Sequence, residues 1–324
     1  MEHYVTYFDS LFLPQGLTLH KSMEKHAGDY LLWILCIDNH TYDVLERLNL
    51  PNIRLLKLET LETDELRSIK KERTKGEYCW TLTPFTMKFV FDADGSVMHV
   101  TYLDADLWFR KSPNPILREF EESRKSVLIT DHAFAAEFDQ SALFGQYCVQ
   151  FMTFKRDMAG EIVRKWWEER CIEWCYNKTE DGKFGDQKYL DNWPDQFSEY
   201  VHVLKNKELM LAPWNATRFP YGNSILWHFH GLRLSGTAHN KFIYYGGYPL
   251  PPLTKRNIYK PYISDLISSI KTLQRYGSKF QSQIKFRTGL FTHFKSIIKG
   301  IYQQLWKIDI YSNRSINYYK IIEK

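Results

Sequence analysis

Continuous apolar runs alternate with amphipathic stretches along the first two thirds of the chain. The run Tyr30–Ile37 is apolar throughout, as a strand buried on both faces of a parallel sheet requires, and it ends at a turn signal, Asp38-Asn39. Similar runs predict strands at Tyr4–Phe8, Ile53–Leu58, Val97–Leu103, Ser126–Thr130 and Gln150–Phe154. Helices are predicted between them at Leu17–Lys25, Thr41–Leu48, Leu61–Arg73, Thr83–Phe91, Gly160–Tyr176 and Phe184–Trp193. This alternation predicts an α/β fold with a mostly parallel central sheet flanked by helices.

A cluster of glycine and proline at residues 246–252 stands where the charge of the chain changes sign. The chain carries a net charge of +5, yet residues 255–324 hold 14 Lys and Arg against 3 Asp and Glu. We therefore expect one globular domain over residues 1–250 and a basic, aromatic-rich helical extension over residues 251–324. Apolar residues at spacings of three and four predict an amphipathic helix at 291–306. An anchor on an anionic membrane surface is the expected use of this extension, and packing against the domain is the alternative.

The composition excludes several classes of protein. Apolar residues make up 44% of the chain and charged residues 25%, which excludes a disordered chain. The longest apolar run is too short to span a membrane. Neither a GxGxxG nor a Walker A motif is present, which argues against dinucleotide and P-loop chemistry. With no secretory signal, scattered cysteines and no nucleic-acid-binding motif, we expect a reduced, cytoplasmic protein without a nucleic-acid partner.

Two carboxylates follow the strand predicted at Val97–Leu103. They are Asp104 and Asp106, in the segment TYLDADLWF. Ligands of open α/β sheets bind beyond the carboxyl ends of the strands, which is where this pair stands. Two neighbouring carboxylates repel each other unless a cation lies between them, and hard oxygen ligands favour Mg²⁺ or Mn²⁺. The segment predicts a divalent metal site, and a turn with two solvated aspartates is the alternative.

A second motif, WHFHGLR, offers imidazole groups. His228 and His230 alternate on a predicted strand end, so their side chains point to opposite faces. One of them can complete a metal site while the other is structural.

A third motif, FGDQKYLDNWP, offers polar groups at a predicted helix start. Gly185 permits a tight approach of the backbone, and Asp186 and Gln187 open the helix where its first side chains face a cleft. The alternative for Asp186 is a helix N-cap without a further role.

In this order, the blocks TLTPF, VTYLDADLWF, YCVQFMTF, GDQKYLDNWP and HFHGLR resemble bacterial sugar-nucleotide-dependent glycosyltransferases with the GT-A fold. The group concerned builds surface polysaccharides, lipopolysaccharide or capsule, and is distantly similar to glycosyltransferase family 8. The resemblance spans about residues 3–235. It implies a Rossmann-like GT-A fold, a nucleotide-diphosphate sugar donor with a UDP-sugar favoured, a glycan or lipid-linked glycan acceptor, and Mn²⁺ or Mg²⁺ as cofactor.

The resemblance also implies roles for individual residues. Asp104 and Asp106 would bind the metal, with His230 as third ligand because the family's histidine lies just before a glycine. Where the family has an asparagine, the chain has Cys148-Val149-Gln150-Phe151, and Gln150 is expected to supply the amide contact to the sugar. The expected donor-binding residues are Phe8, Asp9, Asp38, Lys88, Asp104 and Gln150, and the expected catalytic residues are Asp186 and Gln187.

The sequence therefore predicts a metal-dependent hexosyltransferase of surface-polysaccharide biosynthesis, peripheral on the inner face of the cell membrane. The metal would neutralise the charge of the departing diphosphate, and Asp186 could act as base, nucleophile or cation stabiliser. Similarity to family 8 favours retention of the anomeric configuration. The alternatives are a metal-dependent phosphohydrolase and a non-catalytic peripheral membrane or carbohydrate-binding protein.

Overall fold

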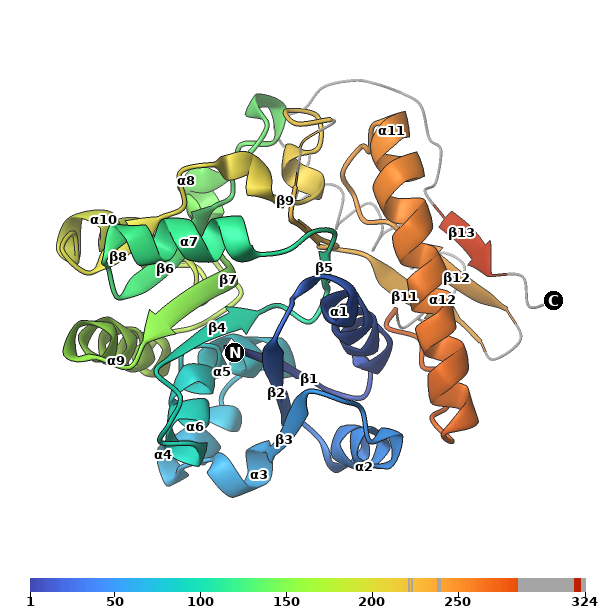
Figure 1. Cartoon of the computed structure of the whole chain (residues 1–324), viewed down its shortest axis with the longest axis horizontal. Helices are drawn as coiled ribbons and strands as arrows, with labels where there is room; N and C mark the ends of the chain where they lie inside the picture. Colours follow the sequence, from blue (N-terminus) through green and yellow to red (C-terminus); the bar gives the residue numbers. More distant parts are fainter. Residues whose placement is uncertain (221, 223, 238–239, 285–317, 322–324) are drawn as a thin grey trace.

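The computed structural model describes residues 1–220, 222, 224–237, 240–284 and 318–321 (Figure 1). Its centre is a seven-stranded sheet in the order β3-β2-β1-β4-β7-β6-β8. These strands are β1 (Glu2–Phe8), β2 (Tyr30–Cys36), β3 (Ile53–Lys57), β4 (His99–Leu103), β6 (Val127–Asp131), β7 (Tyr147–Lys155) and β8 (Val201–Val203). Strands β1 to β4 pair in parallel, whereas β7 is antiparallel to both of its neighbours. The α/β fold with a mostly parallel sheet is confirmed.

Helices cover both faces of this sheet because strand residues alternate between two apolar cores. Tyr4 and Phe8 of β1 lie in one core, and Val5 lies in the other. The first core is closed by α1 (Leu13–His26), α2 (Asn39–Leu48) and α7 (Asn114–Ser123), and the second by α6 (Phe85–Ala93) and α9 (Met158–Glu173). The sheet is thus the middle layer of three.

Side-chain caps determine where several helices begin. Asp38 caps α2 by accepting a hydrogen bond from the Thr41 backbone N–H at 2.8 Å. Asp157 caps α9 in the same way, with the Gly160 N–H at 2.8 Å. These caps satisfy backbone donors that the helix itself leaves without partners.

Two of the expected helices are wrong in detail. The helix expected at Leu61–Arg73 is divided into α3 (Leu58–Leu61) and α4 (Asp64–Lys70), because the Thr63 hydroxyl accepts from the Leu66 N–H and starts a new helix. The helix expected at Phe184–Trp193 is a 3-10 helix over Lys188–Asn192 followed by the single turn α10 (Trp193–Gln196). The remaining short helices are α5 (Lys75–Leu82), α8 (Ser141–Phe144) and α11 (Pro252–Thr254).

Two small sheets lie outside the central one. The first contains β5 (Leu107–Phe109), β10 (Leu226–His228) and β9 (Met210–Leu211). The second contains β11 (Arg233–Gly236), β12 (Lys241–Tyr244) and β13 (Tyr318–Ile321). Strand β10 runs antiparallel to β5, with His228 opposite Leu107. This pairing brings a distant part of the chain to the end of β4.

Helix α12 (Lys260–Arg275) packs beside α1, as Figure 1 shows. Its residues Tyr262 and Leu266 are fully buried in an apolar core that also holds Trp227 and Phe229. The boundary expected near residue 250 stays a prediction, and the helix just beyond it is part of this core. The helix expected at 291–306 lies outside the described residues. Within the described part of the chain, no helix has the length and apolar character needed to cross a membrane.

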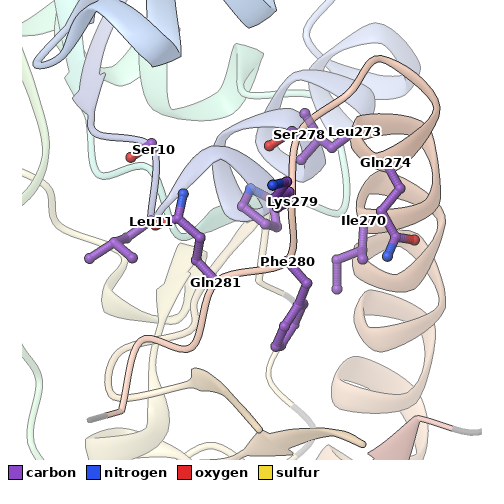
Figure 2. Close-up of a pocket in the computed structure, with 10 residues that line it drawn as sticks. Ser10, Leu11, Ile270, Leu273, Gln274, Ser278, Lys279, Phe280 and Gln281 are labelled. Carbon is purple, nitrogen blue, oxygen red and sulfur yellow. The ribbon is translucent and has the colours of Figure 1, made fainter. Parts of the chain in front are cut away.

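The residues after α12 return to the loop between β1 and α1. The Gln283 amide nitrogen donates to the Leu11 carbonyl at 2.8 Å, and its amide oxygen accepts from the Leu234 N–H at 2.7 Å and from Gln15 at 3.0 Å. Figure 2 shows this segment beside Ser10 and Leu11, around a small pocket. The segment therefore supports the loop that leaves β1.

The packing of α12 gives a stability prediction. Leu266→Ala should lower the free energy of unfolding by about 2–5 kcal/mol, because it removes fully buried atoms and leaves a cavity. Ser264→Ala, on the exposed face of the same helix, is the control and should change it by less than about 0.5 kcal/mol. Urea unfolding followed by circular dichroism measures both. Equally small effects would mean that α12 is dispensable to the folded domain.

Candidate active site

Asp104 and Asp106 lie at the carboxyl end of β4, near the middle of the central sheet. A tight turn follows the strand, in which the Leu107 N–H donates to the Asp104 carbonyl at 3.1 Å. The chain then enters β5, and β5 pairs with β10. Just after β10, the Phe229 N–H donates to the Asp106 carbonyl at 2.9 Å. The two carboxylates and the end of β10 are held together through these backbone bonds.

His228 lies against both carboxylates. Its Nε2 is 3.1 Å from Asp106 Oδ1 and 3.5 Å from Asp104 Oδ2. One ligand atom from each of these three residues lies within 4.8 Å of the others. Burial raises the pKa of Asp104. Burial also acts to raise the pKa of Asp106, but the charge and hydrogen bond of His228, together with the charges of Arg233 and His230, hold that pKa below its usual value. The group is a ready set of two oxygens and one nitrogen for a divalent cation.

His230, the third ligand expected from the sequence, lies beside this group. Its ring is 5.7 Å from the His228 ring and 5.3 Å from the Trp214 ring, centre to centre, and its side chain is exposed. Among the described residues, the group of candidate ligands within 4.8 Å of one another contains His228 and not His230. The assignment of His230 stays a prediction, and the distances favour His228.

Two buried side chains contact this group from behind. The Tyr102 hydroxyl donates to Asp104 Oδ1 at 2.8 Å. The Gln150 amide oxygen lies 2.8 Å from His228 Nδ1, and the Gln150 carbonyl accepts from the Asp104 N–H at 3.1 Å. Gln150, expected to bind the donor, is buried with 1% of its surface exposed, and in this structure its amide oxygen contacts His228. The sequence offered no sign of either contact.

Asp186 is placed near the same carboxylates by a turn that needs glycine. Gly185 has a φ of +51°, in the region that residues with a Cβ rarely adopt, and an added Cβ would lie 3.2 Å from the Trp80 ring. Asp186 is 3% exposed, and no described residue hydrogen-bonds its Oδ2. Burial, with a smaller contribution from the nearby Asp104, raises its pKa to about 7 against the effect of a hydrogen bond from Thr83. An unpartnered buried oxygen of this kind fits a ligand hydroxyl.

Gln187, the second expected catalytic residue, lies at the start of the following 3-10 helix. Its amide nitrogen donates to the Phe144 carbonyl at 2.8 Å. The next residue, Lys188, donates to the Ser141 carbonyl at 2.8 Å. In this structure Gln187 therefore connects the Asp186 turn to α8, and its catalytic role stays a prediction.

The expected nucleotide pocket lies at the carboxyl ends of β1 and β2. Asp9 accepts from the Leu11 and Phe12 N–H groups at 3.0 and 3.2 Å. Asp38, besides capping α2, accepts from the Ser10 N–H at 3.0 Å, so both aspartates bind the backbone of the loop that follows β1. Phe8 is buried and packs against Gly16. The structure thus brings these three expected donor-binding residues together.

Lys75 lies at this pocket although the sequence did not indicate it, whereas the expected Lys88 does not. Lys75, the first residue of α5, forms an ion pair with Asp9. The capping box of Thr74 and Glu77 marks that helix start, but no local pattern shows that Lys75 reaches β1. Lys88 instead pairs with Asp92 on the exposed part of α6. In this structure, Lys88 is not brought to the carboxylates, and its role in donor binding stays a prediction.

The raised pKa of Asp186 gives a prediction with a definite sign. An unfolded chain releases this proton near pH 4 and the folded protein near pH 7, so the stability of the folded state falls as pH rises across that interval. A pKa difference of about three between the folded and unfolded states corresponds to a loss of stability on the order of 4 kcal/mol. Asp186→Asn should therefore raise the melting temperature at pH 8 and leave it nearly unchanged at pH 4. An equal shift at both pH values would show that burial of the charge is not the cause.

No family model matches the chain. Two proteins of Bacillus subtilis strain 168 are similar to it in sequence. Uncharacterized protein YfnF is 32% identical over 248 residues, which are 71% of this chain and 82% of YfnF. Uncharacterized protein YfnD is 29% identical over 290 residues, which are 84% of this chain and 91% of YfnD. The first similarity is close and long enough to define a family.

Solved glycosyltransferases share the fold. Galactosyltransferase LgtC, solved with donor and acceptor sugar analogues, superimposes with a TM-score of 0.53 over 82% of this chain and 95% of its own, at 13% identity. The bifunctional glycosyltransferase WbbM gives a TM-score of 0.51 over 86% of this chain and 52% of its own, at 14% identity. At such identities the likeness establishes the fold. The chain belongs to the same family as YfnF, and its fold is the GT-A fold expected from the sequence.

Proposed function

We propose that the protein is a glycosyltransferase that moves a sugar from a nucleotide-diphosphate donor, with UDP favoured, to a glycan or lipid-linked glycan. One observation carries the proposal: the group of Asp104, Asp106 and His228 lies close to Asp186, whose buried Oδ2 has no partner among the described residues. A cation can stabilise the departing diphosphate, and a neighbouring carboxylate can contact the transferring sugar, so the arrangement suits cleavage of a glycosyl–phosphate bond. The GT-A fold is compatible with this activity.

The donor atoms of the first group fit a divalent metal. Two carboxylate oxygens and one imidazole nitrogen suit Mn²⁺, and the oxygens also suit Mg²⁺. We propose Asp104, Asp106 and His228 as the ligands, in place of the set with His230. When bound, the metal would supply Lewis-acid stabilisation of the diphosphate. The two carboxylates, without such a charge, would repel an anionic donor.

Asp186 is proposed to act on the transferring sugar. In its ionised form, the unpartnered oxygen can accept a hydrogen bond from a sugar hydroxyl and stabilise positive charge at the anomeric carbon. Because burial raises its pKa to about 7, it can also hold a proton near neutral pH. Retention of configuration, as in family 8, is the proposed outcome, and the anomer of the product, read by NMR, tests it.

At the other end of the pocket, Asp9, Asp38 and Lys75 are proposed to face the nucleoside. Lys75, held by its ion pair with Asp9, is proposed to contact an anionic part of the donor. The two alternative functions, phosphohydrolase and non-catalytic binding protein, gain no specific support from the described residues.

The metal site gives a direct test of the function. Asp104→Asn and Asp106→Asn should each lower turnover by at least about 100-fold, since each removes a charged ligand of the proposed metal and with it Lewis-acid stabilisation of the diphosphate. Hydrolysis of a panel of UDP-sugars with Mn²⁺ measures turnover, and the rise in melting temperature with UDP and Mn²⁺ measures binding. Full activity of either variant, or in excess EDTA, would overturn the proposal. His228→Ala should weaken Mn²⁺ binding more than His230→Ala does, and the reverse order would return the ligand role to His230.

Membrane association is proposed through the exposed face of α12. Lys260, Lys271 and Arg275 are exposed and recur at spacings of eleven and four, so they lie along one side of the helix. The opposite side is buried in the domain. A row of cations on an exposed helix face suits an anionic lipid surface, where a lipid-linked acceptor of surface-polysaccharide synthesis would be found.

Co-sedimentation with vesicles tests this surface. Changing Lys260, Lys271 and Arg275 together to Gln should weaken binding to phosphatidylserine vesicles by on the order of 100-fold, at about 1 kcal/mol for each cation. The matched control changes the exposed residues Lys71, Lys165 and Lys178 to Gln. Equal losses in the two variants, or equal binding to neutral vesicles, would rule out this face as the docking surface.

A further inference from the structure

We infer that Gln150 is a positioning residue for the metal site, and that its amide oxygen holds the His228 ring in the tautomer and orientation of a metal ligand. The inference rests on the proposed function, because the metal site is part of it. It also gives Gln150 a role different from the donor contact expected from the sequence.

The His228 ring lies between two acceptor groups. On one side, Nε2 faces Asp106 Oδ1 at 3.1 Å and Asp104 Oδ2 at 3.5 Å. On the other side, Nδ1 lies 2.8 Å from Gln150 Oε1, in a buried contact. The ring therefore presents one nitrogen to the carboxylates and the other to the amide.

Metal binding decides which nitrogen carries the proton. A neutral imidazole has one N–H, and the nitrogen that ligates a metal must keep its lone pair free. If Nε2 is the ligand, the proton lies on Nδ1 and needs a hydrogen-bond acceptor. Gln150 Oε1 is at the right distance to accept it. Acceptors in this position orient ligating histidines and raise their basicity, and their loss typically costs 10–100-fold in metal affinity.

The backbone of Gln150 also contacts the site. Its carbonyl accepts from the Asp104 N–H at 3.1 Å, where β7 continues beside the end of β4. One residue therefore contacts two candidate ligands that lie more than a hundred positions apart in sequence, one through its backbone and one through its side chain. A substitution of the side chain leaves the backbone bond in place and removes only the contact to His228.

The test compares Gln150→Leu with Gln150→Glu in the full chain. Mn²⁺ affinity is measured by electron paramagnetic resonance of the free ion, without donor sugar. Gln150→Leu should bind Mn²⁺ about 10–100-fold more weakly, because it loses the amide oxygen that faces Nδ1. Gln150→Glu keeps an acceptor and should stay close to the wild-type affinity. Thr153→Val is the control. Thr153 lies on the same strand, and its substitution removes a buried 2.8 Å hydrogen bond to Thr101 that is not part of the site.

Three outcomes would overturn the inference. The first is wild-type Mn²⁺ affinity in Gln150→Leu, above all if the KM for the donor rises instead, which would support the donor contact. The second is an equal loss in Gln150→Leu, Gln150→Glu and Thr153→Val, which would show a general effect of packing. The third is a wild-type protein that binds no Mn²⁺. A wild-type protein that binds Mn²⁺ and transfers no sugar would overturn the proposed function and leave the role of Gln150 standing.

Discussion

Repulsion between two carboxylates at the end of one strand is the constraint on which the rest of this site depends. Asp104 and Asp106 are both partly buried, where charges interact more strongly than in water. One hydroxyl donor and one imidazole reduce this repulsion: Tyr102 donates to Asp104, and His228 contacts both carboxylates. A preorganised cluster of this kind is costly without a cation and favourable with one. His228 supplies part of the compensating charge, and a cation at the proposed metal site would supply the rest.

The elements of the central sheet could be predicted because strands buried on both faces leave continuous apolar runs. The positions of Asp104, Asp106 and Asp186 could be predicted for a related reason, since the first two come at the end of an apolar strand and the third follows a glycine turn; their roles stay predictions. Which of His228 and His230 faces these carboxylates could not be predicted. Alternation shows that only one of them faces the carboxylates, but the pairing of His228 with Leu107 in β5 and β10 decides which.

Other parts of the site have no local signal at all. Lys75 and Asp9 meet because α5 begins near the end of β1, and that distance across the fold is set by packing. In the sequence, Gln150 is an ordinary polar residue of a predicted strand, and only the structure shows its contact with His228. The C-terminal helix shows a different limit. Its apolar residues Tyr262 and Leu266 have a spacing that suits a membrane or a protein core equally well, and the structure places them in the core.

The position of His228 late in the chain has a consequence for folding during synthesis. The proposed ligands Asp104 and Asp106 are separated from the third, His228, by more than a hundred residues, and β10, which carries His228, packs against α12. During synthesis the N-terminal residues fold first, so a nascent chain can build the sheet while the carboxylates still lack their imidazole. With the proposed ligand set, full metal affinity would be reached only after β10 and the C-terminal helix have left the ribosome. A nascent chain would then bind a metal at the proposed site only after β10 has paired with β5.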